Sequence, residues 1–176
     1  LILTYSGFVA ARECISSSPR YARLPLVALP GMAAKAGVAA IHCKDEGGRF
    51  RLGSFKAPGG AYAVARLLQR PIGAARGALV PMADIMSRKH ADLAAETTIC
   101  CAADGNHGRS VAWGARTFGA RCVIFIHATV SAGRKTAIEA HGAELRRCDG
   151  NFDDSVPEAE ETATREGGSW SLTPPC

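Results

Sequence analysis

Residues 44–60 read KDEGGRFRLGSFKAPGG and place one lysine, Lys56, between glycine-rich turns at the start of an apolar run. We expect a helix to begin here, because the Ser54 oxygen can accept a hydrogen bond from a backbone amide of the first turn, and Pro58 suits that turn. A lysine amine is protonated and weakly nucleophilic at neutral pH, and it becomes useful in catalysis as a Schiff base. We therefore interpret Lys56 as an amine that bears a cofactor. Taken alone, the pattern is more typical of a glycine-rich turn with a solvated lysine.

Length and composition describe a globular chain with a substantial core. Its 176 residues are 47% hydrophobic, which suggests one domain or slightly more. The net charge of +5 comes mostly from arginines scattered singly or in pairs. Nucleic-acid binding would require a basic stripe interleaved with aromatic residues, so we expect no nucleic-acid partner and a surface that attracts small anions.

The seven cysteines show no Cys-x-x-Cys or Cys/His ligand spacing, which argues against a metal site and a disulfide framework. We expect reduced thiols, mostly buried, in a cytoplasmic protein. The start of the chain has no basic, apolar leader, and no apolar run approaches the roughly 20 residues of a membrane span. We expect no membrane partner. The first residue is Leu1 rather than methionine, which indicates a longer reading frame or a fragment.

The first half of the chain alternates short helices with one strand. Helices are expected at residues 8–15 and 32–37, a buried strand at 38–43, and a helix from Gly60 that ends at Pro71, where the ring interrupts helical hydrogen bonding. Residues 72–96 are interpreted as a tolerated insertion, with one further helix at 83–95 and no chemistry.

A second motif follows a buried strand expected at 97–103. Residues 104–108 read Asp-Gly-Asn-His-Gly, and a helix is expected at 109–118. Glycines allow backbone amides to approach a ligand, and a helix start favours a carboxylate or phosphate. The motif alone is more typical of an ordinary strand-to-helix turn. Together with the turn at Lys56, however, it predicts two helix starts that face one cleft.

The second half predicts a parallel sheet. Strands are expected at 121–127 and 143–148, and helices at 131–141 and 155–166, the last with Pro157 in its first turn. Strand and helix alternate at a spacing typical of parallel strands joined by right-handed crossovers. His107, His127 and His141 have no metal-ligand spacing, and only His107 is expected near the site.

With both motifs in view, the sequence resembles the fold-type II pyridoxal-phosphate enzymes, the family of tryptophan synthase β, threonine deaminase and cysteine synthase. Within this family it resembles the diaminopropionate ammonia-lyases. The resemblance runs from about residue 20 to 168 and rests on KDEGGRF at 44–50, GSFKAPGGAYA at 53–63, DGNHGRSVAW at 104–113 and DGNFDDSV at 149–156. Asp104 is the specific feature, since other members usually carry serine or threonine there.

The resemblance implies pyridoxal 5'-phosphate as cofactor, held by Lys56, Phe55 and Asn106. Lys56 would also take the α-proton of the substrate, and Asp104 would be the second acid/base group, serving the opposite enantiomer. The implied reaction is α,β-elimination of ammonia from 2,3-diaminopropionate, giving pyruvate and ammonia. The small amino-acid substrate would contact the loop formed by Asp104, Gly105, Asn106, His107 and Gly108. Full-length relatives are expected to be homodimers.

The implied fold is α/β, with parallel sheets and helices on both faces, as in tryptophan synthase β. Residues 1–103 would be the first part of a large domain, 104–168 a small domain, and 169–176 a divergent tail. The glycine-rich loop that holds the cofactor phosphate in this family is absent, so we expect a truncated member. A serine or threonine deaminase or a sulfur-transfer synthase on the same scaffold is the alternative enzyme. A noncatalytic remnant that binds a partner or a small anion is the alternative outside catalysis.

Overall fold

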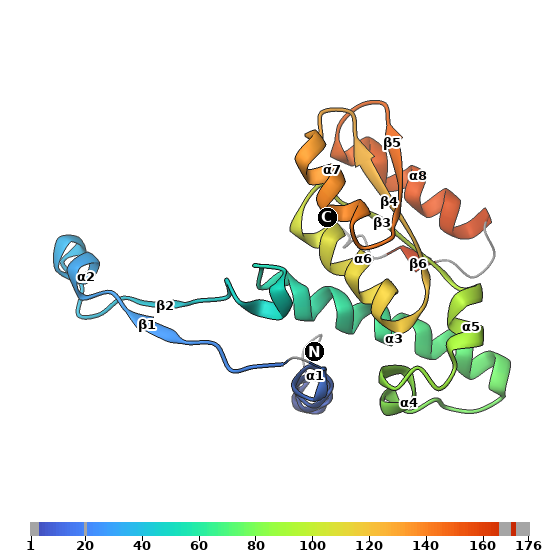
Figure 1. Ribbon diagram of the computed structural model, residues 1–176, viewed down its shortest axis with the longest axis horizontal. Coiled ribbons are helices and arrows are strands. Elements are labelled where there is room, and N and C mark those ends of the chain that lie inside the picture. Colours follow the sequence, from blue (N-terminus) through green and yellow to red (C-terminus); the bar gives the residue numbers. More distant parts are fainter. Residues whose placement is uncertain (1–3, 20, 166–169, 172–176) are drawn as a thin grey trace.

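The computed structural model describes residues 4–19, 21–165 and 170–171, and it consists of a layered body with one projecting arm (Figure 1). The elements in chain order are α1 (Tyr5–Ser17), β1 (Leu26–Ala28), α2 (Pro30–Ala36), β2 (His42–Lys44), the 3₁₀ turn η1 (Arg49–Arg51), α3 (Lys56–Arg76), α4 (Met82–Met86), α5 (Ala91–Glu96), β3 (Thr98–Ala102), α6 (Asn106–Phe118), β4 (Arg121–His127), α7 (Ala132–Glu139), β5 (Glu144–Cys148), α8 (Phe152–Arg165) and β6 (Trp170–Ser171). No helix in these ranges is long and apolar enough to cross a membrane.

A four-stranded sheet in the order β5-β4-β3-β6 forms the centre of the body. All three neighbouring pairs are parallel, with Thr98 opposite Arg121 and Val123 opposite Glu144. The predicted parallel sheet is therefore confirmed. The predicted division of the chain after residue 103 falls at the carboxyl end of β3, within the four-stranded sheet. The assignment of residues 1–103 to a large domain and of residues 104–168 to a small domain stays a prediction.

Helices cover both faces of the sheet, because side chains along a buried strand alternate between faces. On β3, Ile99 and Cys101 join the core under α3 and α6, whereas Cys100 and Ala102 join the core under α8. Strand β4 alternates in the same way, with Phe125 on the α8 side. The predicted α/β class with helices on both faces is thus confirmed.

Helices α3 and α6 cross at very short range, and this crossing positions the site. A Cβ atom built on Gly60 would lie 2.1 Å from Ser110 Oγ, and one built on Gly114 would lie 2.8 Å from the Cα atom of Ala61. Only glycine at positions 60 and 114 allows this approach. The amino ends of the two helices, which carry Lys56 and Asn106, are therefore held in a fixed relation.

Helix α3 does not end at Pro71, contrary to the sequence prediction. It continues through the proline to Arg76 and closes at Gly77, which has a φ of 63°. Beyond the proline, Ile72 is 1% exposed and packs in the same core as Leu68. Tertiary burial of this face outweighs the one backbone hydrogen bond that proline cannot make.

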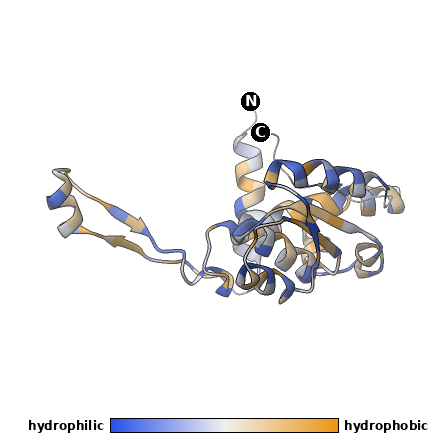
Figure 2. Cartoon of the chain, turned by 90° about the horizontal axis from the view of Figure 1, so that it is seen from above, coloured by the Kyte–Doolittle hydropathy of each residue, from blue (hydrophilic) through white to orange (hydrophobic). Residues whose placement is uncertain are grey.

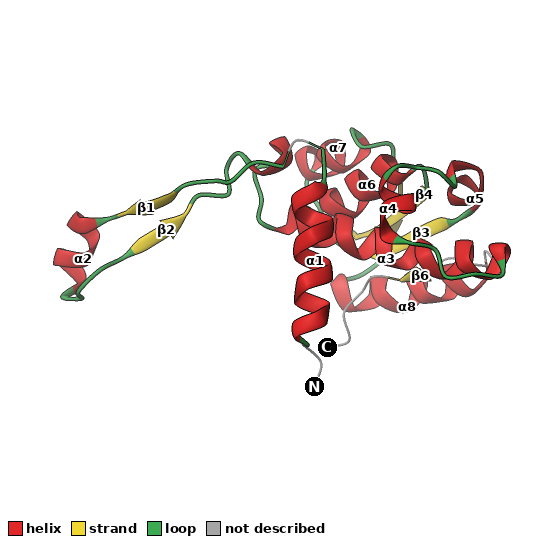
Figure 3. Ribbon diagram, turned by 90° about the horizontal axis from the view of Figure 1, so that it is seen from below, coloured by secondary structure: helices red, strands yellow, loops and turns green. Residues whose placement is uncertain are grey.

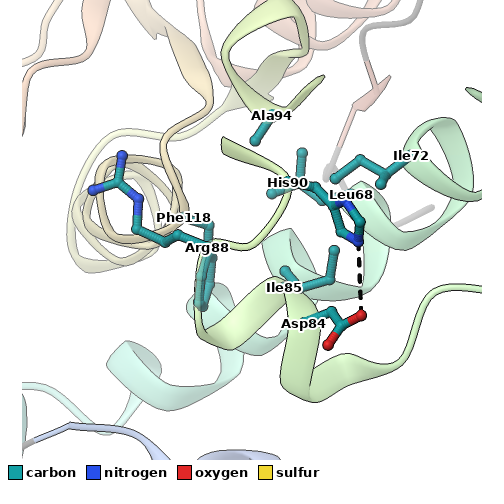
Figure 4. Close-up of a pocket in the computed structure, with 8 residues that line it drawn as sticks. All are labelled: Leu68, Ile72, Asp84, Ile85, Arg88, His90, Ala94 and Phe118. Carbon is teal, nitrogen blue, oxygen red and sulfur yellow. Dashed lines mark ion pairs between the residues drawn. The ribbon is translucent and has the colours of Figure 1, made fainter. Parts of the chain in front are cut away.

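The segment at 72–96 belongs to the core and is not a tolerated insertion. It contains two short helices, α4 and α5, in place of the single helix expected at 83–95. Val80, Ile85 and Ala94 are each 3% exposed. Figure 4 shows Ile85, His90 and Ala94 turned toward Leu68 and Ile72 of α3, with His90 Nε2 at 3.7 Å from Asp84 Oδ2. The space between these side chains does not admit a water molecule, so this region is packing rather than a binding site.

The arm consists of β1, α2 and β2, with α2 at its tip (Figures 1 and 3). Its two strands are antiparallel and pair with each other alone, and all six of their residues are exposed. The buried strand predicted at 38–43 is therefore wrong: the strand is limited to 42–44, and all three of its residues are exposed among the described part of the chain. Hydrophobic colour continues along the arm in Figure 2, and Leu26 and Met32 are 64% and 58% exposed.

Three expected helices are confirmed, and each begins three residues earlier than predicted: α1, α6 and α8. For α8 the reason is a cap, because Asn151 Oδ1 accepts hydrogen bonds from the amides of Asp153 and Asp154 at 2.7 and 3.3 Å. Pro157 was predicted to lie in the first turn of this helix. Because α8 begins at Phe152, Pro157 instead lies beyond the first turn. The predicted helices at 32–37 and 131–141 correspond to α2 and α7.

Candidate active site

A hollow of about 430 Å³ opens where α3, α6 and α7 begin. Its lining comes from three separate parts of the chain: Lys56, Asp104, Gly105, Asn106, Arg109, Gly133, Arg134 and Ala137. The two sequence motifs therefore meet, as the prediction of two helix starts facing one cleft required. The sheet topology explains this, because the carboxyl ends of parallel strands open onto the starts of the helices that follow.

Lys56 is the first residue of α3, and it is exposed. Its amide donates a hydrogen bond to Ser54 Oγ at 3.2 Å, but the N-cap residue of α3 is Phe55, so the prediction that Ser54 is the cap is wrong. The next residue, Ala57, is fully buried and packs with Phe50 and Leu52. Lys56 thus extends into the hollow from a backbone that is anchored on both sides.

Asp104 follows the carboxyl end of β3 and is held by groups from the neighbouring strand and helix. Its Oδ2 atom lies 3.4 Å from His127 Nε2 and 3.7 Å from Arg134 Nη1. His127 is the last residue of β4, so it stands beside Asp104 at the same edge of the sheet. The expectation that only His107 lies near the site is therefore wrong, since His127 contacts Asp104 directly.

The start of α6 supplies backbone amides that precede its first helical hydrogen bond and one exposed amide side chain. The first intrahelical hydrogen bond runs from Arg109 N to Gly105 O at 3.0 Å, so the amides of residues 106–108 precede the ladder of helical hydrogen bonds. Asn106 is exposed at the hollow. Such a helix start favours an anionic group.

Three residues that the sequence predicted to bind cofactor or substrate do not line the hollow. Phe55 is 71% exposed and borders a separate hollow beside Lys44 and Pro58. Gly108 is buried, and a Cβ atom there would lie 3.3 Å from side chains of β4 and α7, so its lack of a side chain serves packing against the sheet. His107 is half-buried on the first turn of α6. The roles predicted for these residues stay predictions.

Sequence reasoning missed the cationic part of the site, Arg109 and Arg134. Together with Lys56 they give the hollow three cations against the single carboxylate of Asp104. Arg109 Nε is inaccessible to solvent and has no hydrogen-bond partner among the described residues. The pKa of His141 is lowered by its burial, and the charges of Arg109 and Arg116 lower it further. The signal for Arg134 was its place in the first turn of the predicted helix at 131–141, because that turn meets the same sheet edge as Asp104.

Comparison with protein families matches residues 18–176 to the pyridoxal-phosphate dependent enzymes. This match extends past residue 168, where the resemblance was expected to end. A diaminopropionate ammonia-lyase from Salmonella typhimurium is 36% identical over 154 residues, covering 88% of this chain and 37% of the relative. One from Escherichia coli K12 is 35% identical over 164 residues, covering 92% of this chain and 39% of the relative. The chain thus spans about two fifths of the length of these relatives.

Solved structures agree with the sequence comparison. The holo form of the Escherichia coli diaminopropionate ammonia-lyase superposes with a TM-score of 0.82 at 34% identity, over 96% of this chain and 42% of that one. A pyridoxal 5'-phosphate-dependent aspartate racemase superposes with a TM-score of 0.73 at 21% identity, over 97% of this chain and 45% of that one, and shares the fold. The family match covers nearly the whole chain, and the hollow at Lys56 occupies the junction where the two sequence motifs meet. The chain belongs to the family of pyridoxal-phosphate-dependent enzymes.

Proposed function

We propose that this chain carries the lysine-bearing part of an active site that eliminates ammonia from 2,3-diaminopropionate, giving pyruvate and ammonia. The observation that carries the proposal is that Lys56 and Asp104, which lie far apart in sequence, line one hollow at adjacent helix starts. The similarity to diaminopropionate ammonia-lyases over about nine tenths of the chain supports the choice of substrate.

The residues present fit pyridoxal phosphate. The hollow offers an exposed primary amine from Lys56, an exposed amide side chain from Asn106 and room of about 430 Å³. Lys56 would hold the cofactor covalently, and Asn106 would hydrogen-bond its 3' oxygen. Bound there, the cofactor supplies an electron sink that stabilises negative charge on the substrate's α-carbon.

The side chains that line the hollow bind the substrate and transfer its α-proton. Arg109, Arg134 and the amino end of α6 bind and orient the substrate carboxylate, because they concentrate positive charge at one edge of the hollow. The amine of Lys56 takes the proton from the α-carbon of one enantiomer. Asp104 takes it from the other enantiomer, since it approaches the hollow from a different element.

The first test is covalent labelling. Purified chain is incubated with pyridoxal phosphate and reduced with borohydride, and the modified peptide is mapped. We expect one equivalent of label at Lys56, none in Lys56→Ala, and full labelling in the control Lys35→Ala, whose residue lies on the arm. Label scattered over other exposed lysines would contradict a preorganised site.

The second test is turnover. Ammonia and pyruvate released from 2,3-diaminopropionate should fall to background in Lys56→Ala and remain in Lys35→Ala. Preference for serine or threonine over 2,3-diaminopropionate would favour the deaminase alternative. Labelling at Lys56 without any ammonia release would support a noncatalytic remnant.

Compartment and assembly form a separate proposal. We infer that the protein works in the reducing cytoplasm, because Cys14, Cys101, Cys122 and Cys148 are buried as free thiols. We also infer a homodimer, supported by the exposed apolar side chains of the arm. Light scattering on the purified chain tests the dimer, and a monomeric mass at all concentrations would refute it.

A further inference from the structure

The end of β4 and the loop that follows it supply His127 and Thr129, which lie beside Asp104. His127 is mostly buried, with a side-chain exposure of 17%, and both of its ring nitrogens have partners. Nε2 lies 3.4 Å from Asp104 Oδ2, and Nδ1 lies 3.0 Å from Thr129 Oγ1. With the Thr129 hydroxyl donating to Nδ1, the proton of the neutral ring resides on Nε2 and is directed to Asp104.

The backbone that carries His127 is held in place from strand β5. The guanidinium of Arg147 donates to the carbonyl oxygens of His127, Ala128 and Val130, at 3.5 Å for the first and 3.4 Å for the last. The amide of Ala128 donates to Gly150 O at 3.3 Å. The imidazole therefore projects from the end of β4, where the path of the chain is fixed by several hydrogen bonds.

The second contact to Asp104 is weaker. Arg134 Nη1 lies 3.7 Å from the same Oδ2 atom, and the Arg134 side chain is 60% exposed. A long, exposed side chain at that distance constrains its partner little. Among the described residues Asp104 Oδ1 accepts no hydrogen bond, so the fixed oxygen is Oδ2 and the oxygen available to a ligand is Oδ1.

We propose that His127 is a positioning residue for Asp104: it holds Oδ2, so that Oδ1 is presented to the α-carbon of the substrate. This inference rests on the proposed function. In the step that Asp104 performs, the bond from the α-carbon to hydrogen breaks and its electron pair stays on the substrate. The proton bonds to Oδ1, while Oδ2 keeps the hydrogen bond from His127. Thr129 and Arg147 act one step further away, on the orientation of the ring and of the loop.

The test compares the two enantiomers of 2,3-diaminopropionate. Asp104→Asn identifies the enantiomer that depends on the carboxylate. We expect His127→Phe to lower kcat for that enantiomer by about tenfold with little change in KM, because a small misplacement of a reacting group is costly. Lys56-dependent turnover of the other enantiomer should change less than about twofold. His127→Gln, whose amide can donate in place of Nε2, should recover most of the loss, and His42→Phe on the exposed arm is the matched control.

The double variant decides whether the effect passes through Asp104. In the Asp104→Asn background, His127→Phe should add no further loss. Equal losses on both enantiomers, or a further loss in that background, would overturn the proposal.

A readout without turnover separates this inference from the proposed function. Urea unfolding of the wild type, His127→Phe, Asp104→Leu and the double variant forms a double-mutant cycle. Coupling of about threefold in the unfolding equilibrium constant supports the contact, and additive effects overturn it. Absence of ammonia release from the wild type would overturn the proposed function alone, and the cycle would still decide the positioning role.

Discussion

The α3–α6 crossing and the β1–α2–β2 arm are both rich in small and apolar residues, yet their burial is opposite. At the crossing, Val64 and Leu68 are fully buried. On the arm, Leu26 and Met32 are more than half exposed. The difference lies in what each element meets: two long helices approach through glycines and cover one sheet face, whereas the two three-residue strands pair with each other and are exposed along their length. Apolar composition therefore indicates burial only where a second layer is present.

The largest difference between the arm and the body is expected in the rate at which their cysteine thiols react. Cys43 lies exposed on the arm, whereas Cys101 lies in the sheet, where burial raises the pKa of its thiol to about 12, with a further contribution from Cys100. We expect Cys43 to react with a disulfide reagent more than about a hundredfold faster than Cys101, because a buried thiol must await opening of the core. Peptide mapping after timed labelling measures both rates. Comparable rates in native buffer would show that the sheet is open.

Leucine truncation tests the same contrast in stability. Leu68→Ala should lower the free energy of unfolding by about 3 kcal/mol, because it leaves a cavity in the core. Leu26→Ala on the arm should change it by less than about 0.5 kcal/mol. Urea denaturation measures both. A loss at Leu26 close to that at Leu68 would indicate that the arm is covered in solution, as a dimer contact would require.

Two adjacent glycines in α3 test the close approach itself. Gly60→Ala should destabilise by about 2 kcal/mol, since its Cβ would clash with Ser110. Gly59→Ala, with no atom within 4 Å of its Cβ, should stabilise by about 0.5 kcal/mol through helix propensity. Opposite signs for the same substitution at neighbouring positions are the expected result of thermal or urea unfolding. Two changes of equal sign would contradict the crossing geometry.

The smallest change in the free energy of unfolding is expected at the residues that join the arm to the body. Arg49 donates to Glu46 Oε2 at 2.7 Å and to Ala22 O at 2.9 Å. The hydrogen bond from Arg49 lowers the pKa of Glu46 below its model-compound value of 4.5, and the charges of Arg49 and Lys44 lower it further. A lowered folded-state pKa gives stability that is present above about pH 4.5 and is lost as pH falls through the folded-state value.

Glu46→Gln tests that linkage. The variant should be less stable than the wild type by a few tenths of a kcal/mol (about 0.5 at most) at neutral pH, and the difference should shrink in acid. Unfolding at pH values on both sides of about 4.5 measures the change. A difference that grows on acidification would reverse the sign and refute the role of the Arg49 hydrogen bond. The variant also shows whether the joint affects the site, since α3 begins ten residues later at Lys56.

Several elements could be predicted from local pattern alone. The runs at 99–102 and 122–126 are apolar throughout and become the buried parts of two strands. Turn residues indicated where the helices between these strands begin and end. The parallel sheet was predicted from the alternation of strands and helices along the chain. The stretches around Lys56 and Asp104 were recognisable because chemistry at a helix start requires glycine, small polar side chains and a reactive group within a few residues.

Other features could not be predicted because they depend on contacts between distant residues. The run at 38–43 is apolar like a buried strand, yet it lies on the exposed arm. Pro71 sits inside a helix because the face beyond it is buried against α4 and α5. His127 contacts Asp104 only through the register of β3 and β4, since nothing in the spacing of 104 and 127 indicates that pair.

The sequence by itself determined the order of strands and helices from residue 97 to 165, the family resemblance and the two motifs that carry Lys56 and Asp104, because these depend on residues close together in the chain. Only the tertiary structure decided which apolar stretches are covered, which proline a helix tolerates and which side chains surround the site. The physical reason is that burial, helix crossing and strand register are relations between distant segments. Arg109, Arg134 and His127 join Asp104 only after the sheet has aligned the ends of its strands.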